Sequence, residues 1–134
     1  MSTMTKKMVL WAEDDPEDQL LLQEAIEDAQ CVNDFFFVDD GEEILQYLAE
    51  HSAPGLIMLD LNMPRKNGLE TLQELKDHPE WSKIPVIIFT TSQADSDMMS
   101  SYDLGVNSFM TKPTTFDGLI EVLRYIESSQ FFYM

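Results

Sequence analysis

Five short apolar runs alternate along the chain with segments whose apolar residues recur at helical spacing. The runs are MVLWA (8–12), FFFV (35–38), LIMLDL (56–61), VIIF (86–89) and SFMT (108–111). Each run is short and rich in aliphatic or aromatic residues, which is typical of strands that are buried on both faces. We therefore predict five strands at these positions.

The segments between the runs predict five helices. The first helix has a clear start, because Asp15 can cap it, Pro16 suits its first turn, and Glu17 and Asp18 favour the positive end of the helix dipole. A fourth, weaker helix is expected over about 95–104, before Gly105. The expected core-facing residues are Leu22, Ala25, Ile26 and Ala29 in the first helix; Ile44, Leu45 and Leu48 in the second; Leu69, Leu72 and Leu75 in the third; and Phe116, Leu119, Ile120 and Leu123 in the fifth.

Strict alternation of strands and helices predicts an α/β fold, with a parallel sheet that is covered by helices on both faces. Right-handed crossovers leave few ways to wind such a sheet. The expected arrangement is doubly wound and flavodoxin-like, with the strand order 2-1-3-4-5. The 134 residues contain no repeat and no linker, so we expect one domain with a core over about 7–128 and a short C-terminal tail.

The charge of the chain restricts its partners. Twenty-five acidic residues against eight basic ones leave a formal charge of -17. This balance argues against direct binding to nucleic acid or to an anionic membrane, and it favours cations or a basic protein surface. Cys31 is the only cysteine, and no apolar run reaches the length of a membrane span or a secretory signal. We therefore expect a cytoplasmic protein.

Acidic residues gather where two of the predicted strands end. Glu13 and Asp14 follow the first strand, and Asp60 lies near the end of the third. Ligands of such sheets bind beyond the carboxyl ends of the strands, at the switch point between strands 1 and 3, so these carboxylates should be neighbours. Their repulsion would be relieved by a cation, and an oxygen-only ligand set suits Mg²⁺. Asp15, the next acid, is interpreted instead as a helix cap.

A hydroxyl and an ammonium group are expected at the same edge of the sheet. Thr90 follows the fourth strand and Lys112 follows the fifth. A lysine at a strand end can be merely solvated, but opposite an acidic pocket Lys112 is interpreted as a counter-charge. This set favours an anion that arrives with Mg²⁺, namely a phosphoryl group on Asp60, since a carboxylate can act as a nucleophile when the charge around it is neutralised.

Four motifs in this order resemble the response-regulator receiver domains of two-component signalling, over essentially the whole chain. They are EDD after the first strand, MLDLNMPRKNGLE around Asp60, IPVIIFTTS through the fourth strand and NSFMTKP through the fifth. The segments TTS, LGVNSF and KPTTF are most similar to small stand-alone receivers that are paired with bacterial phytochrome-type kinases.

The resemblance implies a role for each matching acid. Asp60 would be the phosphoacceptor. Asp14 would bind Mg²⁺ directly, Glu13 would bind it through water, and Asn62 would contribute its backbone carbonyl. Glu13 stands where many receivers have aspartate, which lengthens one arm of the pocket and keeps its charge.

The resemblance also implies a switch. Thr90 would bond a phosphoryl oxygen and turn inward, Lys112 would pair with the phosphoryl group, and the ring of Phe109 would move with Thr90. Phe109 lacks the hydroxyl of the commoner tyrosine. Pro113 would follow a cis peptide bond, which is uncommon even before proline.

The expected function is that of a phosphoacceptor response regulator, which receives its phosphoryl group from a histidine kinase or a histidine phosphotransfer protein. Beyond self-phosphorylation and slow self-dephosphorylation, no enzyme activity is expected. The chain ends soon after the fifth helix, which would leave no room for a DNA-binding output domain, so the signal should pass by protein contact or by onward phosphotransfer.

Two other functions remain open. A degenerate receiver could serve only as a binding scaffold, and label transfer from a phosphodonor would separate the two. A haloacid-dehalogenase-type phosphatase also uses an aspartate nucleophile with Mg²⁺, but it generally needs a second acid where Asn62 stands. Turnover of small phosphomonoesters would identify such an enzyme.

The C-terminal tail carries the apolar sequence FFYM (131–134). It could fold back over the core of the domain. The alternative hypothesis is that it extends a face made by the fourth helix, the fifth strand and the fifth helix into a contact surface, with a homodimer as the simplest partner.

Overall fold

The computed structural model describes residues 7–63 and 66–128, which form a five-stranded parallel sheet with α-helices on both faces. The strands are β1 (Met8–Ala12), β2 (Asp34–Val38), β3 (Leu56–Leu59), β4 (Val86–Thr90) and β5 (Ser108–Thr111). Their order is β2-β1-β3-β4-β5, and every neighbouring pair is parallel. The predicted fold and strand order are therefore confirmed.

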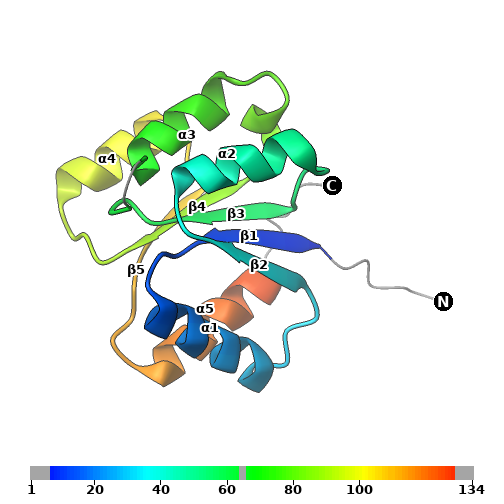
Figure 1. Cartoon of the computed structure of the whole chain (residues 1–134). Coiled ribbons are helices and arrows are strands. Elements are labelled where there is room, and N and C mark those ends of the chain that lie inside the picture. The colour runs from blue at the N-terminus through cyan, green and yellow to red at the C-terminus, as the bar shows by residue number, and fades with distance from the viewer. Residues whose placement is uncertain (1–6, 64–65, 129–134) are drawn as a thin grey trace.

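The helices divide between the two faces of the sheet. They are α1 (Pro16–Asp28), α2 (Gly41–Glu50), α3 (Gly68–Asp77), α4 (Asp95–Asp103) and α5 (Phe116–Ser128), with a short 3-10 helix η1 (Trp81–Lys83) before β4. Figure 1 shows α1 and α5 below the sheet and α2, α3 and α4 above it. The predicted helices are all present. β3 ends at Leu59, earlier than predicted, because Asp60 and Leu61 already belong to the loop that follows it.

Each face of the sheet has its own hydrophobic core. Leu10, Ile57 and Ile88 face α2 and α3, whereas Trp11, Met58 and Phe89 face α1 and α5. Trp11 is 1% exposed and packs edge-on against Phe89, with 5.4 Å between the ring centroids. Trp11 is therefore a core residue. Successive side chains of a buried strand point to opposite faces of the sheet, so neighbouring residues of one strand belong to different cores.

Side-chain caps fix the starts of three helices at the carboxyl edge of the sheet. The Asp15 carboxylate accepts a hydrogen bond of 2.9 Å from the Glu17 N–H at the start of α1, as predicted. At α3, Asn67 and Glu70 form a reciprocal capping box. The Asp40 side chain caps α2. Caps of this kind stabilise a helix start by satisfying amide groups that lack partners within the helix.

Two further observations concern the ends and surface of the chain. No helix in the described residues is both long and apolar enough to span a bilayer. The predicted contact of the tail over 131–134 falls outside residues 7–63 and 66–128, so it stays a prediction.

Gly68 allows α3 to start directly against the backbone of Asp60. A Cβ atom at this position would lie 2.3 Å from the Asp60 carbonyl oxygen, which no rotamer change can relieve. We expect Gly68→Ala to lower the free energy of unfolding by about 2 kcal/mol, the usual cost of overpacking. Urea denaturation measures this loss, and Gln73→Ala on the exposed side of α3 is the control. Equal stability of the two variants would contradict the close approach.

Candidate functional site

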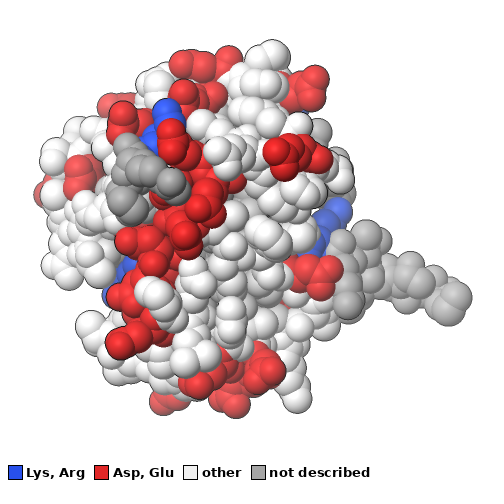
Figure 2. Space-filling model, in the orientation of Figure 1, with Lys and Arg blue, Asp and Glu red and all other residues white. Residues whose placement is uncertain are grey.

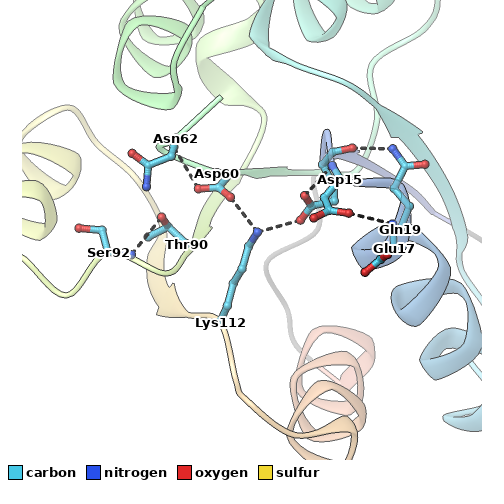
Figure 3. Close-up of polar contacts among 9 residues, drawn as sticks. Asp15, Glu17, Gln19, Asp60, Asn62, Thr90, Ser92 and Lys112 are labelled. Atoms are coloured by element: carbon cyan, nitrogen blue, oxygen red, sulfur yellow. Dashed lines mark hydrogen bonds and ion pairs between the residues drawn. The ribbon is translucent and has the colours of Figure 1, made fainter. Parts of the chain in front are cut away.

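Lys112 joins two buried carboxylates at the carboxyl edge of the sheet. Its Nζ lies 2.8 Å from Glu13 Oε1 and 2.8 Å from Asp60 Oδ2. Glu13 follows β1, Asp60 follows β3 and Lys112 follows β5, so three separate strands supply the cluster. Figure 3 shows Lys112 reaching between Asp60 and the start of α1. The predicted convergence of these groups therefore occurs, with the ammonium group in its centre.

The two ion pairs favour the charged form of Lys112. Burial alone would lower the pKa of Lys112, but its bonds to Asp60 and Glu13 outweigh this effect and raise the pKa above its usual value. Burial raises the pKa of Glu13, and the nearby ammonium group offsets only part of that rise. Lys112 is thus the counter-charge that makes two buried carboxylates tolerable.

Asp60 has a separate partner for each carboxylate oxygen. Oδ1 accepts a 3.0 Å hydrogen bond from the backbone N–H of Asn62, while Oδ2 pairs with Lys112. The residue is 7% exposed, so it is nearly dry but still reaches the surface. A carboxylate with a fixed orientation and a positive neighbour can attack an electrophile at this edge of the sheet.

Thr90 is fully buried at the end of β4, and its hydroxyl is connected to α4. The Ser92 N–H donates to Thr90 Oγ1 at 3.3 Å, and the Ser92 hydroxyl donates to Asp97 Oδ2 at 2.6 Å. Neither Ser92 nor Asp97 is among the site residues predicted from the sequence. A serine just before a helix that lacks a capping side chain of its own is the signal that could have found them.

Phe109 lies on β5 beside the core of the α2 and α3 face. It is half-buried, and its backbone N–H donates to the Tyr102 hydroxyl of α4 at 3.3 Å. The register of the sheet places Phe109 opposite Ile88, two residues before Thr90. Phe109 therefore lies near Thr90 on the next strand, as its predicted role requires.

Asp14 lies beside this cluster but does not join it. Its side chain is exposed, and within the described part of the chain it makes no hydrogen bond or ion pair. No three acidic, histidine or cysteine side chains among residues 7–63 and 66–128 are grouped around a metal position. Glu13 and Asp60 instead pair with Lys112. The oxygen donors of Asp14, Asp60 and the Asn62 carbonyl nevertheless form a set that suits a hard divalent cation.

The surroundings of the cluster are acidic on one side and apolar on the other. Figure 2 shows a band of acidic side chains over the starts of α1 and α2. Next to Lys112 a pocket of about 270 Å³ opens between α1 and the loop before α5, with Leu21, Phe89 and Phe116 among its walls. A partner that approaches the site thus meets negative charge and an apolar hollow together.

One expectation about this loop is wrong. The resemblance implies a cis bond before Pro113, but the described residues contain no cis peptide bond, so the Lys112–Pro113 bond is trans. Trans is the lower-energy form for X–Pro bonds, and Lys112 makes both of its ion pairs with the bond in this form.

Comparisons with known proteins identify the family of this chain. The family model of the response regulator receiver domain matches residues 9–124. Response regulator Rcp1 of Synechocystis sp. is 34% identical over 128 residues, which cover 91% of this chain and 87% of Rcp1.

Solved structures show the same fold at similar identity. The phosphorylated cyanobacterial phytochrome response regulator RcpA is 37% identical, with a TM-score of 0.83 over 92% of each chain. The Mn²⁺-bound form of Rcp1 has a TM-score of 0.80 at 34% identity, over 91% of this chain and 92% of that one. Divalent metal binding is thus a property of receivers of this kind. The chain belongs to the response regulator receiver domain family, whose members are phosphoacceptors in two-component signalling.

Proposed function

We propose that Asp60 is the phosphoacceptor and that its donor is the phosphohistidine of a histidine kinase or a histidine phosphotransfer protein. The observation that carries this proposal is the 2.8 Å ion pair between Asp60 Oδ2 and Lys112 Nζ in a nearly dry pocket. An Asp60 oxygen attacks phosphorus, the P–N bond breaks, and the imidazole leaves with its electron pair. Lys112 then pairs with the transferred group.

The cation of this site is proposed to be Mg²⁺. Asp14, Asp60 and the Asn62 carbonyl would hold it directly and Glu13 would hold it through water. The cation supplies positive charge that neutralises the phosphoryl oxygens. Two observations support this proposal: the exposed carboxylate of Asp14 makes no ion pair within residues 7–63 and 66–128, and Rcp1 binds Mn²⁺. Oxygen ligands with open positions for water and phosphate favour Mg²⁺ in particular.

The phosphoryl group is proposed to be read through α4, β5 and α5. Thr90 would turn toward a phosphoryl oxygen, and Phe109 would follow. Met98, Met99 and Tyr102 on α4 and Tyr125 on α5 are exposed, so a contact surface is available there. The proposed partner is a second copy of the chain, and the proposed donor is a phytochrome-type kinase, as the name of RcpA suggests. The cytoplasmic location stays a prediction of the sequence.

Exposure to acetyl phosphate with Mg²⁺ tests the phosphoacceptor function. We expect one phosphoryl group per chain in the intact mass, and no sustained release of phosphate from small phosphomonoesters. A chain that stays unmodified would be a binding scaffold, and sustained turnover would indicate a phosphatase.

Millimolar Mg²⁺ should raise the melting temperature of the wild-type protein, because the cation binds only the assembled site. We expect Asp14→Ala to lose this response, with a metal-free melting temperature at or above that of the wild type, since one charge leaves an acidic edge. Asp39→Ala, at the end of β2, is the matched control and should respond like the wild type. Equal responses of all three proteins would place the cation elsewhere.

A further inference from the structure

The peptide group between Glu13 and Asp14 accepts a hydrogen bond from a side chain of α1. The Gln19 side-chain amide Nε2 donates a hydrogen bond to the backbone carbonyl of Glu13. The backbone N–H of Gln19 donates to the Asp15 carbonyl at 2.9 Å. Figure 3 shows the amide of Gln19 turned back toward this loop. One half-buried residue thus binds the chain on both sides of Asp14.

The neighbours of Asp14 have further contacts, whereas its own side chain has none. The Glu13 N–H donates to the Val38 carbonyl at 2.9 Å, and the Asp15 N–H donates to Glu13 Oε2 at 3.2 Å. The Asp14 carboxylate is exposed and has no hydrogen bond or ion pair in the described residues. Its direction is therefore set by the backbone on either side of it.

Within that backbone, the Glu13 carbonyl is the group that the Gln19 side chain binds. Rotation about the Cα–C bond of Glu13 would move this oxygen away from Nε2 and would move the Asp14 Cα with it. A water molecule bound to this carbonyl would not restrict that rotation. A side chain anchored in a helix does restrict it, because its own position is fixed.

We propose that Gln19 is a positioning residue that orients the Asp14 carboxylate for the divalent cation. This inference rests on the proposed function, in which Asp14 binds the metal. Groups that orient metal ligands without touching the metal typically contribute tenfold to hundredfold in affinity. We expect Gln19→Met, which keeps the length of the side chain and removes its donor, to raise the Kd for Mg²⁺ about tenfold.

Calorimetric titration of the full chain with Mg²⁺ measures this effect. Gln23→Met is the matched control, because it makes the same change one turn further along α1, at an exposed residue whose side chain makes no hydrogen bond within the described chain. The control should bind Mg²⁺ like the wild type. Without metal, the melting temperature of Gln19→Met should be slightly lower than that of Gln23→Met, because Glu13 is only 2% exposed and its carbonyl loses a hydrogen-bond donor.

The outcomes separate this inference from the function on which it rests. If the wild-type protein or Asp14→Ala shows that Asp14 does not bind Mg²⁺, the proposed metal site is wrong. If Asp14 is required but Gln19→Met binds Mg²⁺ as tightly as Gln23→Met, only the role of Gln19 is wrong. A lower metal-free melting temperature with unchanged Mg²⁺ affinity would likewise assign Gln19 a merely structural role.

A measurement on the wild-type protein keeps the test valid if Gln19→Met does not fold. The side-chain amide protons of Gln19 should exchange with solvent more slowly than those of Gln23, and addition of Mg²⁺ should slow them further as the loop is fixed. Equal exchange at the two glutamines would overturn the inference.

Discussion

Asp60→Asn should abolish phosphorylation of the chain by acetyl phosphate. An amide oxygen is a far weaker nucleophile than a carboxylate, and the substitution leaves the bond to the Asn62 N–H available while it removes the charge that pairs with Lys112. Intact mass should show the added phosphoryl group in the wild-type protein and none in the variant. Because Asn retains the size of Asp, the variant should fold.

Asp39→Asn is the matched control for this experiment. Asp39 is exposed at the carboxyl end of β2, on the same edge of the sheet, but without a lysine partner in the described residues. The control should be phosphorylated like the wild type. A similar yield of phosphorylated Asp60→Asn would show that another group accepts the phosphoryl group, and the assignment of Asp60 would then be wrong.

The convergence of Glu13, Asp60 and Lys112 could be predicted because it depends only on strand order. Short continuous apolar runs that alternate with segments of 3.6-residue periodicity indicate the parallel sheet, and the rule for switch points then places the carboxyl ends of β1 and β3 side by side. Asp15 could be predicted as a cap for a similar reason, since its position relative to Pro16 determines its role.

The contacts that the sequence did not predict each join a residue of a helix to a loop or a strand. Gln19 reaching back to Glu13, Ser92 bonding Asp97, and Tyr102 bonding the Phe109 N–H depend on the direction of single side chains. Hydrophobic periodicity carries no information on such directions. The trans bond before Pro113 was also not predicted, because local sequence alone does not set the isomer of an X–Pro bond.

Lys112→Met should give the largest loss of stability among the variants considered. The substitution keeps an aliphatic side chain and removes the ammonium group, so Glu13 and Asp60 remain buried without a counter-charge. We expect the free energy of unfolding at pH 7 to fall by about 3 kcal/mol, the usual cost of removing one partner of a buried ion pair. Urea denaturation measures it, and Lys83→Met, at an exposed lysine of η1, is the control that should change little.

The pH dependence of Lys112→Met distinguishes lost charge from lost packing. Burial already raises the pKa of Glu13 above its ordinary 4.5, and loss of the ammonium group, which lowers it, should raise it further. The folded state then binds a proton more tightly than the unfolded state, so the free energy of unfolding must decrease as pH rises through the folded pKa of Glu13. The deficit relative to the wild type should therefore be greatest at neutral pH and should shrink as pH falls toward 4.5.

Adding Glu13→Gln to Lys112→Met should recover much of the lost stability at pH 7 and flatten this dependence. A deficit that is the same at both pH values, with no recovery in the double variant, would mean that Lys112 contributes through packing and that the carboxylates do not need its charge.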